Sequence, residues 1–135
     1  MLIPLLLGIT LCYYYTSIPY RSHEDVLSKL KQLAQYLRLS DNARKRIDNM
    51  FIVVDKVTYT ENKRIIHLCV NKDDLLFDKD TVLIAAIHEL AHVIYDGNGH
   101  TYEFREIERE LLDKALEKGM ITKLLVNPSY PCSNV

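Results

Sequence analysis

The chain has 135 residues, with 17 lysines and arginines against 18 aspartates and glutamates, and a formal net charge of −1 at pH 7. This length favours a single domain with one modest hydrophobic core. The balanced charge excludes the strongly basic surface that most nucleic-acid-binding domains need, so we expect no nucleic-acid partner. Three widely spaced cysteines, Cys12, Cys69 and Cys132, do not form a disulfide framework. A single Cys69–Cys132 bridge would require an oxidising compartment, and the sequence leaves that pairing open.

The first twenty residues carry no charged side chain. The apolar run Leu2–Cys12 is followed by three tyrosines and then, after Tyr20, by Arg21. This order is typical of a short membrane span that ends in an aromatic belt and a basic anchor. We therefore expect residues 1–20 to be a transmembrane or signal-anchor segment that places the protein at a membrane, and residues 21–135 to form the globular domain. The positive charges after the span favour a cytoplasmic orientation. A cleaved signal peptide and a buried N-terminal strand or helix are the alternatives.

Two amphipathic helices are predicted next. Ser22–Asp25 resembles a capping box that begins a helix reaching about Leu39. Its apolar residues recur at helical spacing, and they are Val26, Leu30, Leu33 and Leu37. Ser40 can cap a shorter helix, whose apolar residues are Ala43, Ile47 and Met50. We interpret the basic residues of this second helix, Arg44, Lys45 and Arg46, as a solvated face.

Three strands are predicted after these helices. Phe51–Val54 is the first, and Val57–Thr60 with Arg64–Val70 forms a hairpin closed around residues 61–63. His67 lies in the second arm of the hairpin, where we expect it to make a polar cross-strand contact rather than to bind a metal. The acidic segment 71–79 is expected to be a loop.

A long helix is predicted over Thr81–Tyr95. Its core stripe has helical spacing and consists of Leu83, Ile87, Leu90 and Ile94. Either Asp78 or Asp80 can cap its start, and the turn with Gly97 and Gly99 ends it.

The predicted helix contains the motif His88-Glu-Leu-Ala-His92. Two histidines four residues apart lie on one helix face, so both imidazoles can reach one Zn²⁺ at about 2.0–2.1 Å. Glu89 projects near the same face, where a carboxylate can take a proton from a metal-bound water. The spacing therefore predicts a catalytic zinc site with Glu89 as its general base.

A third ligand has to come from outside the helix. His100 is our first candidate, because the turn 96–99 can fold the chain back towards the metal. Glu103 is the rival, on a second long helix that Thr101 can cap and Gly119 can end. Its apolar face consists of Phe104, Ile107, Leu111, Ala115 and Leu116, and its early glutamates, Glu103, Glu106 and Glu108, complement the helix dipole.

A family resemblance rests on these residues. His88–His92 followed by Gly99-His-Thr-Tyr-Glu-Phe104 resembles the WLM-type zinc metalloproteases, relatives of the SprT-like proteins, and is most similar to the small WLM-like proteins of large DNA viruses. The likeness runs from the strand Ile66–Val70 to Tyr130-Pro-Cys132, roughly half the chain. It implies a zincin-like α+β fold, in which a small mixed sheet packs on the metal helix and its flanking helices.

The same resemblance implies site roles. His88, His92 and His100 would bind zinc, Glu89 would be the catalytic base, and Ile66–Val70 would border the substrate cleft. The chain departs from the cellular DNA-repair members of the family, whose third histidine stands closer to the second in more basic surroundings. This difference argues against DNA–protein crosslink repair.

We therefore expect a membrane-anchored zinc metallopeptidase that acts on a protein or peptide. The oxyanion would need a donor besides the metal, for which Tyr95, Tyr102 and Tyr130 are candidates. The alternative is a catalytically silent zinc-binding module of a membrane or virion. A structural zinc site normally fills all four coordination positions with protein ligands and has no use for a base, so Glu89 favours the enzyme.

Overall fold

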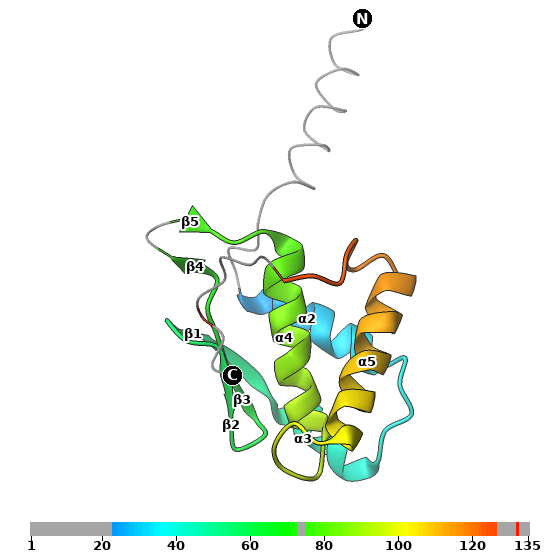
Figure 1. Cartoon of the computed structure of the whole chain (residues 1–135). Coiled ribbons are helices and arrows are strands. Elements are labelled where there is room, and N and C mark those ends of the chain that lie inside the picture. Colours follow the sequence, from blue (N-terminus) through cyan, green and yellow to red (C-terminus); the bar gives the residue numbers. More distant parts are fainter. Residues whose placement is uncertain (1–22, 73–74, 127–131, 133–135) are drawn as a thin grey trace, which may run out of the picture.

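The computed structural model describes residues 23–72, 75–126 and Cys132. Within them the fold is α+β, as predicted, with four helices, a three-stranded sheet and a two-stranded hairpin. The elements in chain order are α2 (His23–Ala34), α3 (Asp41–Asn49), β1 (Phe51–Val54), β2 (Tyr59–Glu61), β3 (Ile65–Leu68), β4 (Asn71–Lys72), β5 (Leu75–Leu76), α4 (Lys79–Ile94) and α5 (Tyr102–Glu117). Helix α4 lies between the sheet and α5 (Figure 1).

The three-stranded sheet is mixed and has the order β1-β3-β2. Strand β1 pairs with β3 in parallel, and β2 pairs with β3 in the antiparallel sense. The predicted hairpin is confirmed, and its turn places Asn62 and Lys63 at φ of 53°, the left-handed region that tight hairpin turns require. Because side chains alternate along strands, Ile52, Ile66 and Thr60 share one row on the face towards α4.

Helix α4 confirms the long helix predicted over Thr81–Tyr95 and resolves its cap. Asp78 is the N-cap: one carboxylate oxygen accepts from the backbone N–H of Thr81 at 2.8 Å, and the other from its hydroxyl at 2.9 Å. The helix ends at Ile94, with Tyr95 as its C-cap. The predicted core stripe is buried, and so are most of the residues beside it. This helix is therefore an internal element, wrapped by its neighbours, rather than a surface helix with one apolar side.

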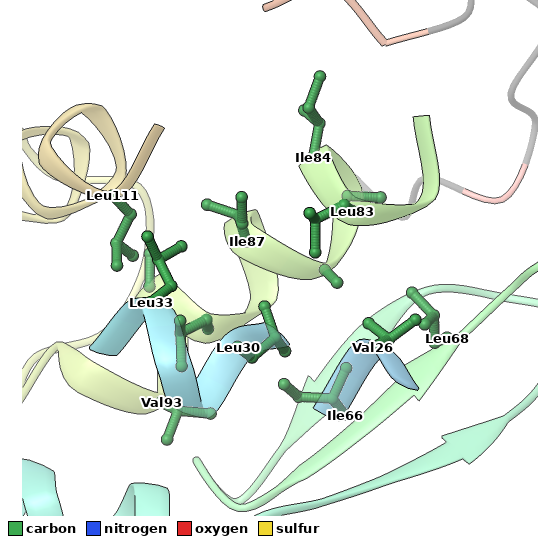
Figure 2. Packing of buried hydrophobic residues seen from close by; sticks show 14 of the residues in the cluster. Val26, Leu30, Leu33, Ile66, Leu68, Leu83, Ile84, Ile87, Val93 and Leu111 are labelled. Atoms are coloured by element: carbon green, nitrogen blue, oxygen red, sulfur yellow. The ribbon is translucent and has the colours of Figure 1, made fainter. Parts of the chain in front are cut away.

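The core forms where helices α2 and α4 meet the inner face of the sheet and where α5 packs on these two helices. Leu30 and Leu33 of α2 lie near Ile87 of α4, while Val26 lies over Ile66 and Leu68 of β3 (Figure 2). Leu111 of α5 closes the same cluster from the other side. This packing fixes α4 relative to both the sheet and α5, which are the two elements that complete the site described below.

Two segments differ from their predicted form. Helix α2 ends at Ala34 rather than near Leu39, because residues 35–37 close tighter turns onto the carbonyls three residues earlier. Leu37 is nevertheless buried. Its helical spacing from the apolar residues of α2 therefore correctly indicated that it is buried, but not that the helix extends to it. The acidic segment 71–79 contains the short hairpin of β4 and β5 where a loop was expected.

The interpretation of Arg46 as part of a solvated face is wrong. Its guanidinium donates from Nε to the carbonyl of Val93 at 2.6 Å and from Nη2 to that of Ile94 at 2.8 Å. Nη2 also lies 2.7 Å from the carboxylate of Asp96. The final carbonyls of an α-helix have no partners within the helix, and cations favour that end. Arg46 of α3 therefore caps the C-terminal end of α4.

Lys63 caps the same helix end from the sheet side. Its ammonium donates to the carbonyl of His92 at 3.0 Å and lies 5.5 Å from the centre of the Tyr95 ring. The carbonyls of residues 92–94 at the end of α4 thus accept hydrogen bonds from one side chain of α3 and one of the turn between β2 and β3.

The C-terminal residues are attached to the domain at two places. Cys69 and Cys132 form the disulfide that the sequence left open, with their Cα atoms 5.9 Å apart, and Thr58 N–H donates to the Cys132 carbonyl at 2.8 Å. Nearer to α5, the backbone N–H and the hydroxyl of Thr122 both donate to the carboxylate of Asp80.

The predicted membrane segment, residues 1–20, lies outside the described residues. Among the residues that are described, no helix has the length and apolar character needed to cross a membrane.

The cap by Arg46 yields a stability prediction. Arg46→Ala removes two hydrogen bonds from a cation to buried helix-end carbonyls, and bonds to charged groups are each worth about 1.5–3 kcal/mol before relaxation and water compensate. We expect a loss of about 2 kcal/mol in the free energy of unfolding, which corresponds to a fall in Tm on the order of 10 °C. Lys45→Ala, an exposed change of the same charge on the same helix, is the control and should leave Tm nearly unchanged. Equal melting temperatures for the two variants would show that Arg46 does not hold the helix end.

Candidate metal centre

Three imidazoles meet at the C-terminal half of α4. His88 and His92 project from the helix one turn apart and are half-buried, while His100 approaches from the turn that follows. The potential ligand atoms of all three lie within 4.8 Å of one another. Among the described residues this is the one group of histidine, cysteine and carboxylate side chains that could hold a metal ion. The structure thus brings together the three predicted ligands.

The spacing of the nitrogens suits a tetrahedral ion. His92 Nε2 and His100 Nε2 lie 3.1 Å apart. Two nitrogens that each sit about 2.0–2.1 Å from a tetrahedral zinc would be about 3.3 Å apart, so the observed separation differs by about 0.2 Å. Imidazole nitrogen is a preferred donor for zinc. The donor set therefore fits this metal, and among the described residues it fills three of the four positions of a tetrahedron.

A short turn delivers His100. Gly99 has φ of +79°, a conformation that most other residues avoid. At Gly97 a Cβ atom would lie 2.5 Å from the ring of Tyr95, so that ring can pack against the turn only because position 97 has no side chain. The hydroxyl of Thr101 donates to the Tyr95 hydroxyl at 2.8 Å and also caps α5. The turn is therefore held at both of its ends.

The side chain of Phe104 supports the three imidazoles from α5. Its buried ring stacks on His92, with ring centres 4.3 Å apart, and lies 5.2 Å from His88 and 4.9 Å from His100. An apolar ring in this place limits the rotamers that the histidines can adopt and shields one side of the cluster from water.

Glu89 points towards the sheet and is 6% exposed. Its Oε1 accepts from the hydroxyl of Thr60 on β2 at 3.0 Å, and its backbone carbonyl lies 3.2 Å from the same hydroxyl. Burial raises the pKa of Glu89, although the neighbouring His88 and the Thr60 hydrogen bond act in the opposite direction. The carboxylate is therefore held through one oxygen, at a place where it interacts with the charge of His88.

Glu108 is a site residue for which the sequence predicts another role. Its place among the early glutamates of the helix predicts that it complements the helix dipole, whereas the structure places its carboxylate on the Nδ1 atom of His88. The spacing of the apolar residues in α5 nevertheless indicates that Glu108 faces the interior of the domain. Phe104, Glu108, Leu111 and Ala115 share one helical stripe, so a carboxylate stands at a position where the other members are buried.

The charges of the site act differently on the two helix histidines. Burial lowers the pKa of His88, but the hydrogen bond and the charge of Glu108 outweigh it, so the net shift is upwards. For His92, burial and the charges of His88 and His100 lower the pKa to about 4. His92 is therefore neutral at pH 7, the form in which an imidazole binds a metal.

Other predicted residues lie elsewhere. Glu103, the rival ligand, is exposed and does not belong to the histidine group. His67 makes the polar contact expected of it: Nδ1 lies 3.0 Å from an oxygen of Asp55, and the ring stacks on Tyr59 across the strands. Strand β3 pairs on both sides, so the edge strand beside Glu89 is β2 rather than the segment Ile66–Val70.

The three tyrosines predicted as candidate oxyanion donors lie in different surroundings. The Tyr95 hydroxyl accepts a hydrogen bond from the Thr101 hydroxyl, a bond that does not use its own proton. Tyr102 begins α5 and is 73% exposed, and Tyr130 lies outside the described residues.

Comparison with known proteins finds relatives among viruses. No protein-family model and no solved structure matches the chain. Uncharacterized protein 042R of Invertebrate iridescent virus 3 is 43% identical over 74 residues, which are 53% of this chain and 46% of that protein. Uncharacterized protein 136R of Invertebrate iridescent virus 6 is 37% identical over 67 residues, 47% of this chain and 38% of that protein. The matches thus span less than half of each relative, and they support the expected similarity to viral proteins.

The geometry of the three imidazoles makes a prediction about metal content. Purified protein should bind about one Zn²⁺ per chain, as measured by atomic emission after dialysis. His100→Ala should weaken binding because it removes one of three ligands. Glu103→Ala, three residues further along, should not, because its carboxylate lies outside the group. If Glu103→Ala strips the metal while His100→Ala retains it, the assignment of the third ligand is wrong.

Proposed function

We propose that this protein is a zinc-dependent metallopeptidase that hydrolyses peptide bonds, with His88, His92 and His100 holding the metal and Glu89 serving as general base. The observation that carries the proposal is the convergence of three imidazoles, with the buried carboxylate of Glu89 close enough to His88 to interact with its charge. We further propose that the domain has a zincin-like fold related to the WLM-type proteases, on the strength of the motif and of the mixed sheet packed against the metal helix.

When bound, zinc would supply Lewis-acid chemistry and lower the pKa of a coordinated water towards ~7. Glu89 takes a proton from the attacking water and delivers it to the leaving amine. Its raised pKa suits a group that both accepts and releases a proton, because a very weak base could not take the proton up. Thr60 holds the carboxylate through Oε1, which leaves the second oxygen to exchange the proton. The same hydroxyl limits rotation of the base between the two steps.

The edge of β2 offers a way to bind an extended peptide. Strand β2 is at one side of the sheet, and Thr60, which contacts Glu89, is its middle residue. A peptide that pairs with such an edge receives backbone hydrogen bonds whatever its sequence. The start of this edge is already used, since Thr58 N–H donates to Cys132. We therefore propose that substrate pairs with the part of β2 nearest to Glu89.

A silent zinc-binding module is the alternative. Such a site is normally closed by four protein ligands, whereas the described residues supply three. It would also gain nothing from a buried carboxylate that does not bind the metal, since burying a charge costs free energy. Both features favour an enzyme over a scaffold.

We also propose that residues 1–20 anchor the protein in a membrane. This part of the proposal rests on the sequence, namely twenty residues without a charge that end in an aromatic and basic boundary.

Substitution of Glu89 separates the enzyme from the scaffold. Glu89→Gln keeps the side-chain volume and an oxygen that can accept from Thr60, so zinc content and Tm should change little. Hydrolysis should fall by ~10²–10⁴-fold, because the proton acceptor is lost. His88→Ala should lose metal, activity and stability together, because zinc binding contributes to the free energy of folding.

The assay is cleavage of a peptide library by the wild type and both variants, read by mass spectrometry, with a chelator control. Autocleavage counts as turnover. If the wild type cuts no peptide, or if Glu89→Gln cuts as well as the wild type, the protease assignment fails and the zinc-binding module becomes the better account.

The anchor has its own test. Full-length protein should sediment with membranes and resist carbonate extraction, whereas a truncated protein that starts at Arg21 should stay in the supernatant. Full-length protein that is unprocessed and remains in the supernatant would refute the anchor. This result would leave the proposal for the metal centre unaffected.

A further inference from the structure

We propose that Glu108 is a positioning residue of the metal centre: its carboxylate accepts the Nδ1 proton of His88 and thereby presents His88 Nε2 to the metal. The inference rests on the zinc site of the proposed function but not on peptide hydrolysis. It deepens the account of the site by adding a residue from α5 that touches neither substrate nor metal.

Glu108 stands at a position where a carboxylate needs a partner. Its side chain is 25% exposed, and it lies in the α5 stripe whose other members, Phe104, Leu111 and Ala115, are buried. A carboxylate in such a place costs desolvation free energy unless a partner compensates for it. The partner is His88 Nδ1, twenty residues earlier in the chain.

The chemistry of the imidazole explains how a carboxylate at Nδ1 presents Nε2 to a metal. A neutral histidine carries its proton on one nitrogen and its lone pair on the other, and the lone pair is what binds the metal. A carboxylate at Nδ1 favours the tautomer with the proton there, because an anion accepts that proton and repels a lone pair. The lone pair is then on Nε2. A partner of this kind also fixes the rotation of the ring and makes the ligand more basic.

Helix α5 constrains His88 in two ways. Glu108 holds the Nδ1 side, and Phe104, one turn earlier on the same helix, meets the ring edge-on with centres 5.2 Å apart. His88 is also 4.9 Å from His100 and 5.1 Å from His92, ring centre to ring centre. The ring is thus held by α5 on one side while it faces the other two ligands.

A direct role of Glu108 as a metal ligand is the competing assignment. It is disfavoured because the carboxylate already contacts Nδ1 and because Glu108 does not belong to the group of atoms that converge within 4.8 Å. The two roles differ in what they predict for the coordination sphere, and the experiment below uses that difference.

The experiment measures metal binding by the full-length protein, with zinc and cobalt as probes. Glu108→Ala and Glu108→Gln are compared with the wild type by competition against a chromophoric chelator. Glu110→Ala is the matched control, since Glu110 is exposed, lies on the same helix and carries the same charge. The visible absorption of the Co²⁺ form reports the ligand set, and ¹⁵N shifts of labelled imidazoles in the zinc form report which nitrogen of His88 carries the proton.

We expect Glu108→Ala to weaken zinc binding by ~10–100-fold, the usual effect of losing an outer-sphere partner. Glu108→Gln should lose less, because its amide oxygen can still accept the Nδ1 proton, and this variant also decides the matter if the alanine variant does not fold. Glu110→Ala should bind like the wild type. The Co²⁺ spectrum should keep its tetrahedral form in each variant, and in the wild type His88 should carry its proton on Nδ1.

Three results would overturn the inference. They are wild-type zinc affinity in Glu108→Ala, loss of the tetrahedral Co²⁺ spectrum in Glu108→Gln (which would make Glu108 a ligand), and a His88 proton on Nε2. A wild type that binds zinc through the assigned tautomer but cuts no peptide would refute the peptidase and leave the role of Glu108 intact.

Discussion

Helix α4 has to carry ionisable side chains through the interior of a small domain, and much of the remaining structure follows from this constraint. Twelve of its sixteen residues are buried, and Glu89 is among them. A buried charge or an unpaired helix end costs more than most single contacts contribute. Three other elements therefore supply partners for polar groups of this helix. Thr60 of β2 meets Glu89, Glu108 of α5 meets His88, and Arg46 of α3 meets the final carbonyls.

This arrangement links stability to the geometry of the site. The cation of Arg46 holds both the helix end and Asp96, the first residue of the turn that carries His100. Glu108 and Phe104 belong to one helix, which Thr101 caps directly after His100. Elements that are far apart in the sequence thus set the three imidazoles relative to one another. With zinc bound, the two charges of the ion would be balanced by the carboxylates of Glu89 and Glu108, which limits the cost of a partly buried cation.

The local features of the sequence were sufficient to predict the elements of the site. Capping residues and hydrophobic period located α4 and α5, the motif placed His88, Glu89 and His92 on one helix, and the glycine turn brought His100 back. These features involve residues within a few positions of one another, where helix geometry alone fixes the spacing. The disulfide was a different case, because the pairing of Cys69 with Cys132 depends on how the ends of the domain meet.

The partners of the site could not be assigned in this way. Arg46 contacts carbonyls 47 and 48 residues away, and Thr60 contacts a carboxylate 29 residues away, so both contacts depend on how helices and sheet pack. Composition suggested that Arg46 was solvated and that Glu108 served the helix dipole. Both residues nevertheless stand on or beside the apolar stripe of their helix, at Ala43–Ile47 and Phe104–Leu111. A charged residue at such a position indicates that a partner should be sought in the tertiary structure.

A crystal structure of the zinc-soaked protein, with anomalous data on both sides of the zinc absorption edge, tests the central claim most directly. The account predicts one anomalous peak per chain, at about 2.0–2.1 Å from Nε2 of His88, His92 and His100, with Glu89 outside the coordination sphere. A peak at another place, or zinc held by Glu103 or Glu108 in place of one of the three histidines, would contradict it.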